Sequence, residues 1–186
     1  WGQLGVGATG NKNIPTQIGA ATNWTAIAAG YGYTMALKSN GTLWAWGDNQ
    51  CGQLGDGTFQ NKYIPTQIGT ATNWAKITGG SLHSIALKSD GTLWAWGYNF
   101  YGQLGDGTRV DKNTPTQIGP PTYWTAIAAG AGHTVALKSD GTLWAWGYNF
   151  YGQSGSGQST WYLTPTLVGP NMNWAAIAAG ANCNYT

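Results

Sequence analysis

Two histidines are the side chains in this sequence best suited to metal binding or acid–base chemistry. His83 and His133 lie 50 residues apart, and Tyr33 and Cys183 occupy the corresponding places in the neighbouring copies of the same pattern. A zinc site would require both imidazoles to approach one ion to about 2.1 Å, together with further ligands. No third ligand is evident, and a required ligand would not be replaced by tyrosine. We therefore predict structural histidines, each hydrogen-bonded inside its own unit of the fold, and no metal site.

The carboxylates offer no pair for acid–base catalysis. The sequence contains six aspartates and no glutamate. Hydrolysis by two carboxylates needs both to face one bond, and the sequence also lacks the common nucleophile, phosphate-binding and metalloprotease motifs. We predict that the protein is not an enzyme and uses no cofactor. Four of the aspartates lie in short turns, where this residue type stabilises the loop locally: Asp56, Asp90, Asp106 and Asp140.

The composition is that of a weakly charged protein rich in small and aromatic residues. Only 8% of the residues are charged, whereas there are 30 glycines and 12 tryptophans. A net charge of +2 with scattered basic residues gives no surface for nucleic acid. No apolar stretch approaches the roughly 20 residues of a membrane-spanning helix. Cys51 and Cys183 occupy different positions within the repeat described next, so we expect no disulfide between them.

The elements that must position these residues recur with a period of 50 residues. A fixed period of this length is typical of tandem repeats in which each copy is one supersecondary unit. We predict a single repeat domain over 1–186, with copies at 1–50, 51–100 and 101–150 and a partial copy at 151–186, about 3.7 copies in all. One tryptophan marks each copy, with no insertion between copies: Trp24, Trp74, Trp124 and Trp174.

Each unit contains four predicted β-strands. An Asn-Gly or Asp-Gly pair separates the second strand from the third, which is a strong hairpin signal. The fourth strand contains Pro65, whose missing amide hydrogen places it at the outer edge of a sheet. In the first unit the predicted strands are 24–29, 34–38, 42–46 and 64–68.

The third strand of each unit is apolar at every position, as in Leu93-Trp94-Ala95-Trp96. A strand of this kind is buried on both faces, and a propeller blade is sandwiched between two neighbouring blades. We therefore predict an all-β fold, a β-propeller of four-stranded antiparallel blades. Within it, we expect Trp94 and Trp144 to be largely buried between adjacent sheets.

The repeat resembles the regulator of chromosome condensation repeat, and it is closest in character to bacterial members. The segments that carry this resemblance are GQLGDGT, PTQIG and ALKSDGTLWAWG, and together the copies cover essentially the whole chain. The resemblance implies a ring of seven blades. This sequence supplies three complete blades, with an unpaired outer strand near 14–18 and an unpaired first strand at 174–179. We expect a partial ring or part of a seven-bladed assembly, whose unfinished blades are covered by a longer parent chain or by self-association.

Aromatic residues gather in the loop that follows each LWAWG strand. The first copy has Asp48-Asn49-Gln50-Cys51 at this place, whereas the next two copies are aromatic. A propeller stacks equivalent loops on one rim, and aromatic clusters with few charges are typical of protein-binding hot spots. We expect Phe100 and Phe150 to be exposed. The predicted partner-binding residues are Tyr98, Phe100, Tyr101, Tyr148, Phe150 and Tyr151.

The leading functional hypothesis is a non-catalytic scaffold that binds another protein through these loops. The resemblance supports it, because secreted bacterial relatives that inhibit β-lactamase hold their partner with loop aromatics. A guanine-nucleotide exchange factor for a small GTPase is the alternative, although the relative that acts on Ran uses inserted segments that these repeats lack. A carbohydrate-binding propeller is a further alternative, since aromatic rings also suit sugars. We expect no nucleic-acid partner and no membrane insertion, and a secreted or cell-surface location is favoured over a cytoplasmic one.

Overall fold

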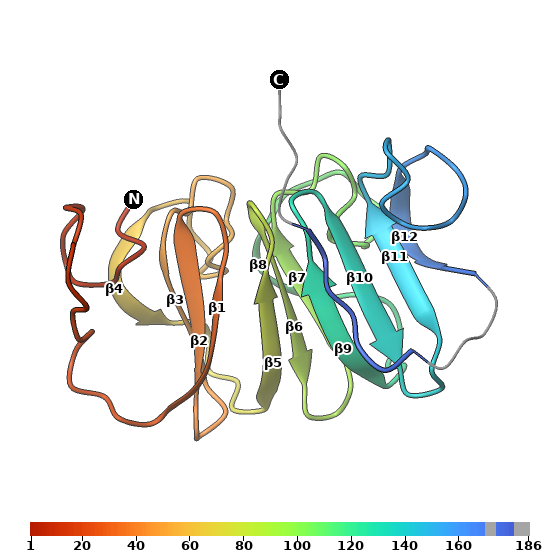
Figure 1. Cartoon of the computed structure of the whole chain (residues 1–186). Coiled ribbons are helices and arrows are strands. Elements are labelled where there is room, and N and C mark those ends of the chain that lie inside the picture. Colours follow the sequence, from red (N-terminus) through yellow and green to blue (C-terminus); the bar gives the residue numbers. More distant parts are fainter. Residues whose placement is uncertain (170–173, 181–186) are drawn as a thin grey trace.

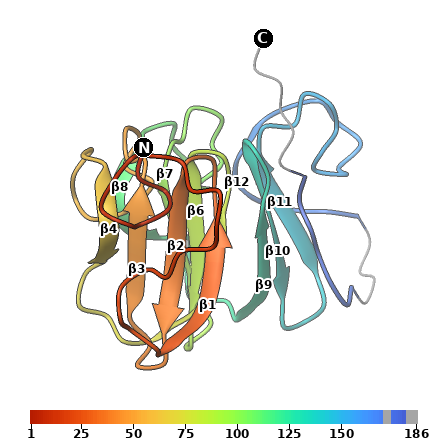
Figure 2. The ribbon, with the colours of Figure 1, turned by 60° about the vertical axis from the view of Figure 1, so that its left-hand side comes forward.

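The computed structural model describes residues 1–169 and 174–180. Over these residues the chain forms twelve β-strands in three four-stranded antiparallel sheets, and no helix. The three sheets follow one another in a row, and each turns a face toward its neighbour (Figures 1 and 2). Among the residues so described, no helix is long and apolar enough to cross a membrane.

Each sheet is one blade in which four consecutive strands pair in chain order. Blade 1 contains β1 (Trp24–Ala29), β2 (Tyr33–Lys38), β3 (Leu43–Gly47) and β4 (Lys62–Gln67). Blade 2 contains β5 (Trp74–Gly79), β6 (His83–Lys88), β7 (Leu93–Gly97) and β8 (Lys112–Gln117). Blade 3 contains β9 (Trp124–Ala129), β10 (His133–Lys138), β11 (Leu143–Gly147) and β12 (Tyr162–Leu167).

The order of the strands places the first strand of each blade on the inside and the fourth on the outside. Strand β5 lies against both β1 and β9, so the first strands of the blades surround a common axis. The fourth strands pair only with the third strands of their own blades, and each contains the proline of its repeat. The prediction that Pro65 lies in an outer edge strand is therefore confirmed.

The two terminal segments that we expected to be strands form none. Inside the blades, a fourth strand pairs with the third strand of the same blade, and residues 1–13 form no strand that could pair with 14–18. A first strand pairs with the second strand, and the residues that would follow 174–179 as a second strand lie outside the described part of the chain. Since an extended segment becomes a strand only beside a hydrogen-bonding neighbour, both expectations were wrong.

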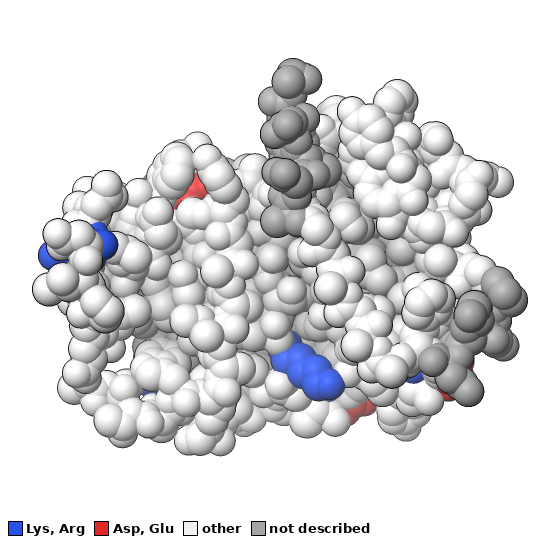
Figure 3. Space-filling model, viewed as in Figure 1, with Lys and Arg blue, Asp and Glu red and all other residues white. Residues whose placement is uncertain are grey.

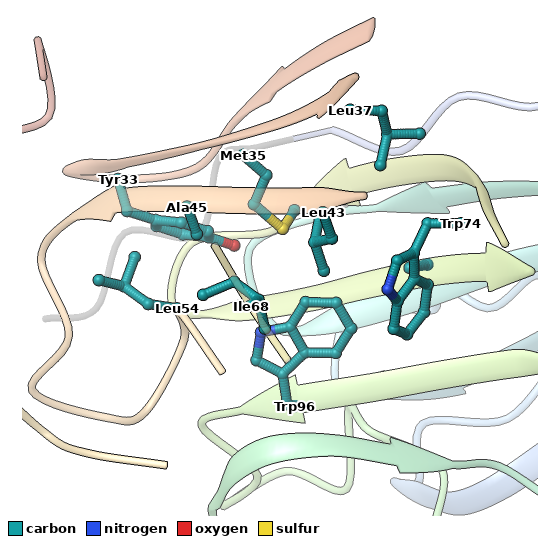
Figure 4. Packing of buried hydrophobic residues seen from close by; sticks show 10 residues of the cluster. Tyr33, Met35, Leu37, Leu43, Ala45, Leu54, Ile68, Trp74 and Trp96 are labelled. Carbon is teal, nitrogen blue, oxygen red and sulfur yellow. The ribbon is translucent and has the colours of Figure 1, made fainter. Parts of the chain in front are cut away.

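The hydrophobic core lies between the blades rather than inside any one of them. Trp96 of blade 2 is completely buried, in a cluster that includes Leu43 and Ile68 of blade 1 (Figure 4). Trp94, two residues earlier, is half-buried, and the ammonium of Lys88 lies 3.9 Å from its ring centroid. The prediction that Trp94 and Trp144 are largely buried was therefore wrong in extent, because both are only half-buried where they pack against the inter-blade clusters. The completely buried tryptophans are Trp96 and its counterpart Trp146.

Hydrogen bonds fix the loops after the third strands of blades 1 and 2 to the following blade. The Gln53 carbonyl of blade 1 accepts the indole N–H of Trp96 at 2.9 Å and the hydroxyl of Ser84 at 2.7 Å, both from blade 2. The neighbouring Gly55 has φ +80°, and a Cβ atom there would lie 2.7 Å from the Trp96 indole nitrogen. Glycine is thus required at this position by both backbone conformation and space.

His83 makes a further hydrogen bond between blades, from blade 2 to blade 3. Its Nε2 lies 3.1 Å from the Thr134 hydroxyl of blade 3, and that hydroxyl donates its proton to the Gln103 carbonyl at 2.8 Å. Because Thr134 has only one proton to donate, Nε2 must carry the imidazole proton, and Nδ1 has none. Nδ1 is buried without a hydrogen-bond partner. The His83 imidazole therefore bonds to the following blade. Our expectation that it bonds inside its own blade was wrong.

The burial of His83 makes the stability of the fold sensitive to acid. Burial, with a smaller contribution from the charge of His133, lowers the pKa of His83 from 6.5 to about 3. As the pH falls below 6.5, the unfolded chain binds a proton that the folded chain does not, so stability present above pH 6.5 is lost progressively toward pH 3. Lowering the pH from 7 to 5 should reduce the free energy of unfolding by about 2 kcal/mol through His83 alone. Urea denaturation at the two pH values measures this loss.

The control for this prediction is His83→Gln, which keeps a side-chain N–H donor but does not titrate. The variant should lose the part of the pH dependence that belongs to His83. A smaller part should remain, because burial also lowers the pKa of His133. An unchanged pH dependence in the variant would contradict the role given to His83.

Candidate functional site

Three long loops join the third strand of each blade to the fourth, and all three lie at the same end of the blades, the upper edge in Figure 1. They comprise residues 48–61, 98–111 and 148–161. The second loop is organised by Asn99, which is completely buried. Its Oδ1 accepts the Leu104 amide at 3.0 Å, and its Nδ2 donates to Asp106 at 3.0 Å. The Asn99 amide in turn donates to Asp111 at 2.8 Å.

Charged groups brace this loop from outside. The Lys112 ammonium lies 3.5 Å from the Asp106 carboxylate. Burial alone would raise the pKa of Asp106, but hydrogen bonds from Thr108 and Asn99 and the charge of Lys112 together lower it. The first loop and the residue after it repeat this arrangement with two asparagines, an aspartate and a lysine: Asn49, Asn61, Asp56 and Lys62.

The third loop lacks the two aspartates, and the residue after it is not a lysine. Ser156, Trp161 and Tyr162 stand where the second loop has an aspartate, another aspartate and a lysine. Asn149 keeps the bond from the Ser154 amide at 2.8 Å and donates to the Gln158 carbonyl at 2.6 Å. The Tyr162 hydroxyl donates to Ser156 at 2.9 Å in place of the ion pair. At these three positions the charged residues of the second copy are thus replaced by one serine and two aromatic residues.

Trp161 joins the second and third loops through ring contacts. The ring centroids of Tyr101 and Tyr148 are 4.9 Å apart, and those of Tyr101 and Trp161 are 5.2 Å apart. Phe100 lies 5.2 Å from Tyr101, and Arg109 lies with its guanidinium carbon 4.7 Å from the Trp161 centroid. We call the resulting continuous surface the rim patch. It comprises Tyr98, Phe100, Tyr101, Arg109, Tyr148, Phe150, Tyr151 and Trp161.

The structure brings together all six residues predicted from the sequence and shows how exposed each is. Phe100 is 49% exposed and Phe150 60%, which confirms the expected exposure of both. Tyr151 is 77% exposed, whereas Tyr98, Tyr101 and Tyr148 are half-buried between the loops. These placements describe a surface, and the partner-binding role of the residues stays a prediction.

Sequence reasoning missed two members of the rim patch, Arg109 and Trp161. The signal for Trp161 was its position, because it replaces Asn61 and Asp111 of the other copies, where a polar residue caps the loop. The position of Arg109 gave no signal, because the corresponding residues Phe59 and Ser159 are of different types. Its contact with Trp161 depends on how two loops from different blades meet.

Cys51, in the first loop, is the free cysteine among the described residues and a further candidate for a reactive side chain on this rim. Burial, reinforced by the charges of Asp111 and Asp48, raises the pKa of the Cys51 thiol to about 11, so the reactive thiolate is disfavoured at neutral pH. Nowhere in 1–169 or 174–180 do three histidine, cysteine or acidic side chains gather as a metal site would need. The upper right of Figure 3, formed by the third loop, shows no charged side chain.

Three four-stranded blades around one axis, with their long loops on one rim, define a segment of a β-propeller. The chain belongs to the regulator of chromosome condensation (RCC1) repeat family, whose repeat matches residues 1–37, 40–87, 90–137 and 140–185. A second description of the same repeat matches 24–53, 74–103 and 124–153.

Solved structures of similar proteins agree with this assignment. Human WBSCR16 is 25% identical with a TM-score of 0.87, over 97% of this chain and 49% of that one. Prp20p from Saccharomyces cerevisiae is 23% identical with a TM-score of 0.77, over 86% of this chain and 42% of that one. Yeast RCC1 (Prp20) bound to Kap60 is 24% identical with a TM-score of 0.71, over 80% and 37%. The chain thus spans half or less of the length of these structures, and the yeast likenesses show the shared fold.

Proposed function

We propose that the protein is a non-catalytic scaffold that holds another protein on its rim patch. The observation that carries this proposal is the third loop and the first residue of the strand after it, where Ser156, Trp161 and Tyr162 stand in place of the charged Asp106, Asp111 and Lys112. A residue change that removes structural bonds and places a tryptophan beside exposed rings favours binding over stability. Tryptophan, tyrosine and arginine are the residue types enriched at the energetic centres of protein interfaces.

What is known of similar propellers supports a protein as the partner. The structure of Prp20p was described together with its binding properties to Gsp1p and histones. The other yeast structure holds the same protein bound to Kap60. Propellers of this fold thus bind proteins, and the partner of the present chain is to be sought in the same class of ligand.

The test is a double substitution of the two exposed phenylalanines, Phe100→Ala with Phe150→Ala. Removing both rings should lower capture of a bound protein about 100-fold or more, since truncating a hot-spot side chain costs about 2 kcal/mol or more. Folding should persist, because both side chains are exposed. Affinity capture followed by mass spectrometry finds the partner, and titration of the purified partner measures the loss.

Phe59→Ala is the matched control, because Phe59 lies in the first loop, outside the rim patch, and is 54% exposed. The control should bind the partner as the unchanged protein does. Equal binding by all three proteins, with folding intact, would place the site elsewhere. Stimulated nucleotide release from a small GTPase would favour the exchange-factor alternative, and patch-dependent signals on a glycan array would favour the carbohydrate alternative.

A further inference from the structure

We propose that the rim patch recognises an acidic peptide segment in which aspartate or glutamate adjoins an apolar side chain. This inference rests on the proposed function and adds the chemistry of the partner. It is carried by Arg109, whose exposed guanidinium lies over the Trp161 ring. In the part of the chain that the structure describes, the ion pairs are those of Lys62 and Lys112, and Arg109 has none.

The other charged side chains of the second loop, and Lys112 next to it, already have an ion-pair or hydrogen-bond partner. Lys112 pairs with Asp106 at 3.5 Å. Asp111 accepts the backbone amide of Asn99 at 2.8 Å, and among the described residues it makes no ion pair with Arg109. The third loop contains no charged residue at all. Arg109 is therefore the uncompensated charge at the edge of an aromatic surface, and a carboxylate is the group that complements it.

The geometry of the cation–π contact leaves Arg109 able to bind such a group. A guanidinium that lies over an aromatic ring still has N–H groups that are not directed at the ring, and their planar arrangement matches the two oxygens of a carboxylate. Trp161 comes from blade 3 and Arg109 from blade 2, so the contact between the loops fixes the cation beside the apolar rings. A ligand that spans both features needs a carboxylate and an apolar group a few ångströms apart.

The arrangement of the rings favours a peptide over a sugar. Tyr101 meets Trp161 at an interplanar angle of 86° and Phe100 at 85°, and Phe150 meets Tyr151 at 87°. Rings at right angles to their neighbours present edges and corners, into which branched or aromatic side chains pack. Tyr98 and Phe100 are near-parallel at 15°, but the rings around Trp161 are inclined to it by 43° to 86° and form no flat platform on which a sugar ring would stack.

The experiment measures binding of three labelled synthetic peptides by fluorescence polarisation. They contain Glu-Leu-Glu-Phe, its neutral counterpart Gln-Leu-Gln-Phe, and Glu-Gly-Glu-Gly within the same flanking sequence. The first should bind about tenfold or more tightly than the other two, and its affinity should fall as salt is raised. Arg109→Glu should remove this advantage, and Arg109→Lys should retain part of it, because lysine keeps the charge but not the planar fork.

Lys12→Glu is the matched control, since it reverses the charge of another exposed cation, in the segment before blade 1. It should bind the acidic peptide as the unchanged protein does. Equal binding of the Glu and Gln peptides, unaffected by Arg109→Glu but lost in Trp161→Ala, would overturn the acidic specificity and leave the protein-binding function standing. Binding of none of the peptides would also overturn the inference, while a protein captured through Phe100 and Phe150 would still support the proposed function. Tighter, Arg109-dependent binding of an oligouronate than of any peptide would overturn both.

Discussion

Replacing Trp96 by alanine should destabilise the protein by about 3–5 kcal/mol, as expected for a large aromatic side chain removed from a core. The Trp96 side chain is completely buried between blades 1 and 2. Its removal also leaves the Gln53 carbonyl without the indole N–H that it accepts at 2.9 Å. The loss should appear in urea denaturation as a lower midpoint with an unchanged slope.

Trp94→Ala is the matched control for this prediction, because it removes the same side chain from the same strand. Trp94 is half-buried, donates to Thr92 at 2.9 Å and lies beside Lys88 and the ring of Trp74. We expect a loss of about 1–2 kcal/mol, in line with one modest hydrogen bond and exposed cation–π and aromatic contacts. A loss for Trp94 equal to that for Trp96 would contradict the assignment of Trp96 to the inter-blade core.

Replacing Asn99 by alanine should cost about 3 kcal/mol and weaken partner binding at the same time. The change leaves the Leu104 amide, the Asp106 carboxylate and the Thr108 carbonyl without the hydrogen bonds that Asn99 makes to them. Each bond lost in this way costs about 1 kcal/mol or more. The loop would then no longer hold Phe100 and Tyr101 against the third loop. Urea denaturation measures the first effect, and titration with the partner measures the second.

The matched control is Asn149→Ala in the third loop. Asn149 makes two side-chain hydrogen bonds where Asn99 makes several, so the expected loss of stability is smaller, about 1–2 kcal/mol. Similar losses for the two variants would show that the polar braces of the second loop contribute little to its stability. Preserved partner binding in Asn99→Ala would show that the loop does not depend on this asparagine for its shape.

The local elements of the blades could be predicted from the sequence, because each is set by near neighbours. The Asp-Gly turn selects a hairpin, and Pro65 selects an outer edge, so the three blades and their strand order followed directly. The facing of the tryptophan strand could not be predicted in this way. LWAW is apolar at every position, so no alternation distinguishes Trp94 from Trp96. The choice between them depends on the neighbouring blade, whose distance and orientation local pattern does not contain.

In the candidate site, too, the local features could be predicted from the sequence, whereas the contacts between blades could not. The sequence predicted that the aromatic residues of 98–101 and 148–151, which precede a turn-forming glycine, lie on one rim. The structure brings Tyr101 and Tyr148 into contact. Arg109 and Trp161 were missed because their meeting joins two blades, and no spacing within one repeat encodes it. His83 was misjudged for the same reason, since its hydroxyl partner lies in the following blade.

The hydrogen bonds between blades give the chain a direction of assembly. Tyr33 of blade 1 donates to the His83 carbonyl at 2.5 Å, and His83 of blade 2 is bound to Thr134 of blade 3. Each of these two side chains thus bonds to a residue that is synthesised later, so this part of the contact between two blades forms only after the second of them has emerged. We expect nascent chains to gain protease resistance in steps of one blade, as in arrays whose units interact only with their neighbours. Growth of this kind lets an organism lengthen or shorten such a protein by whole blades without redesigning the ones that remain.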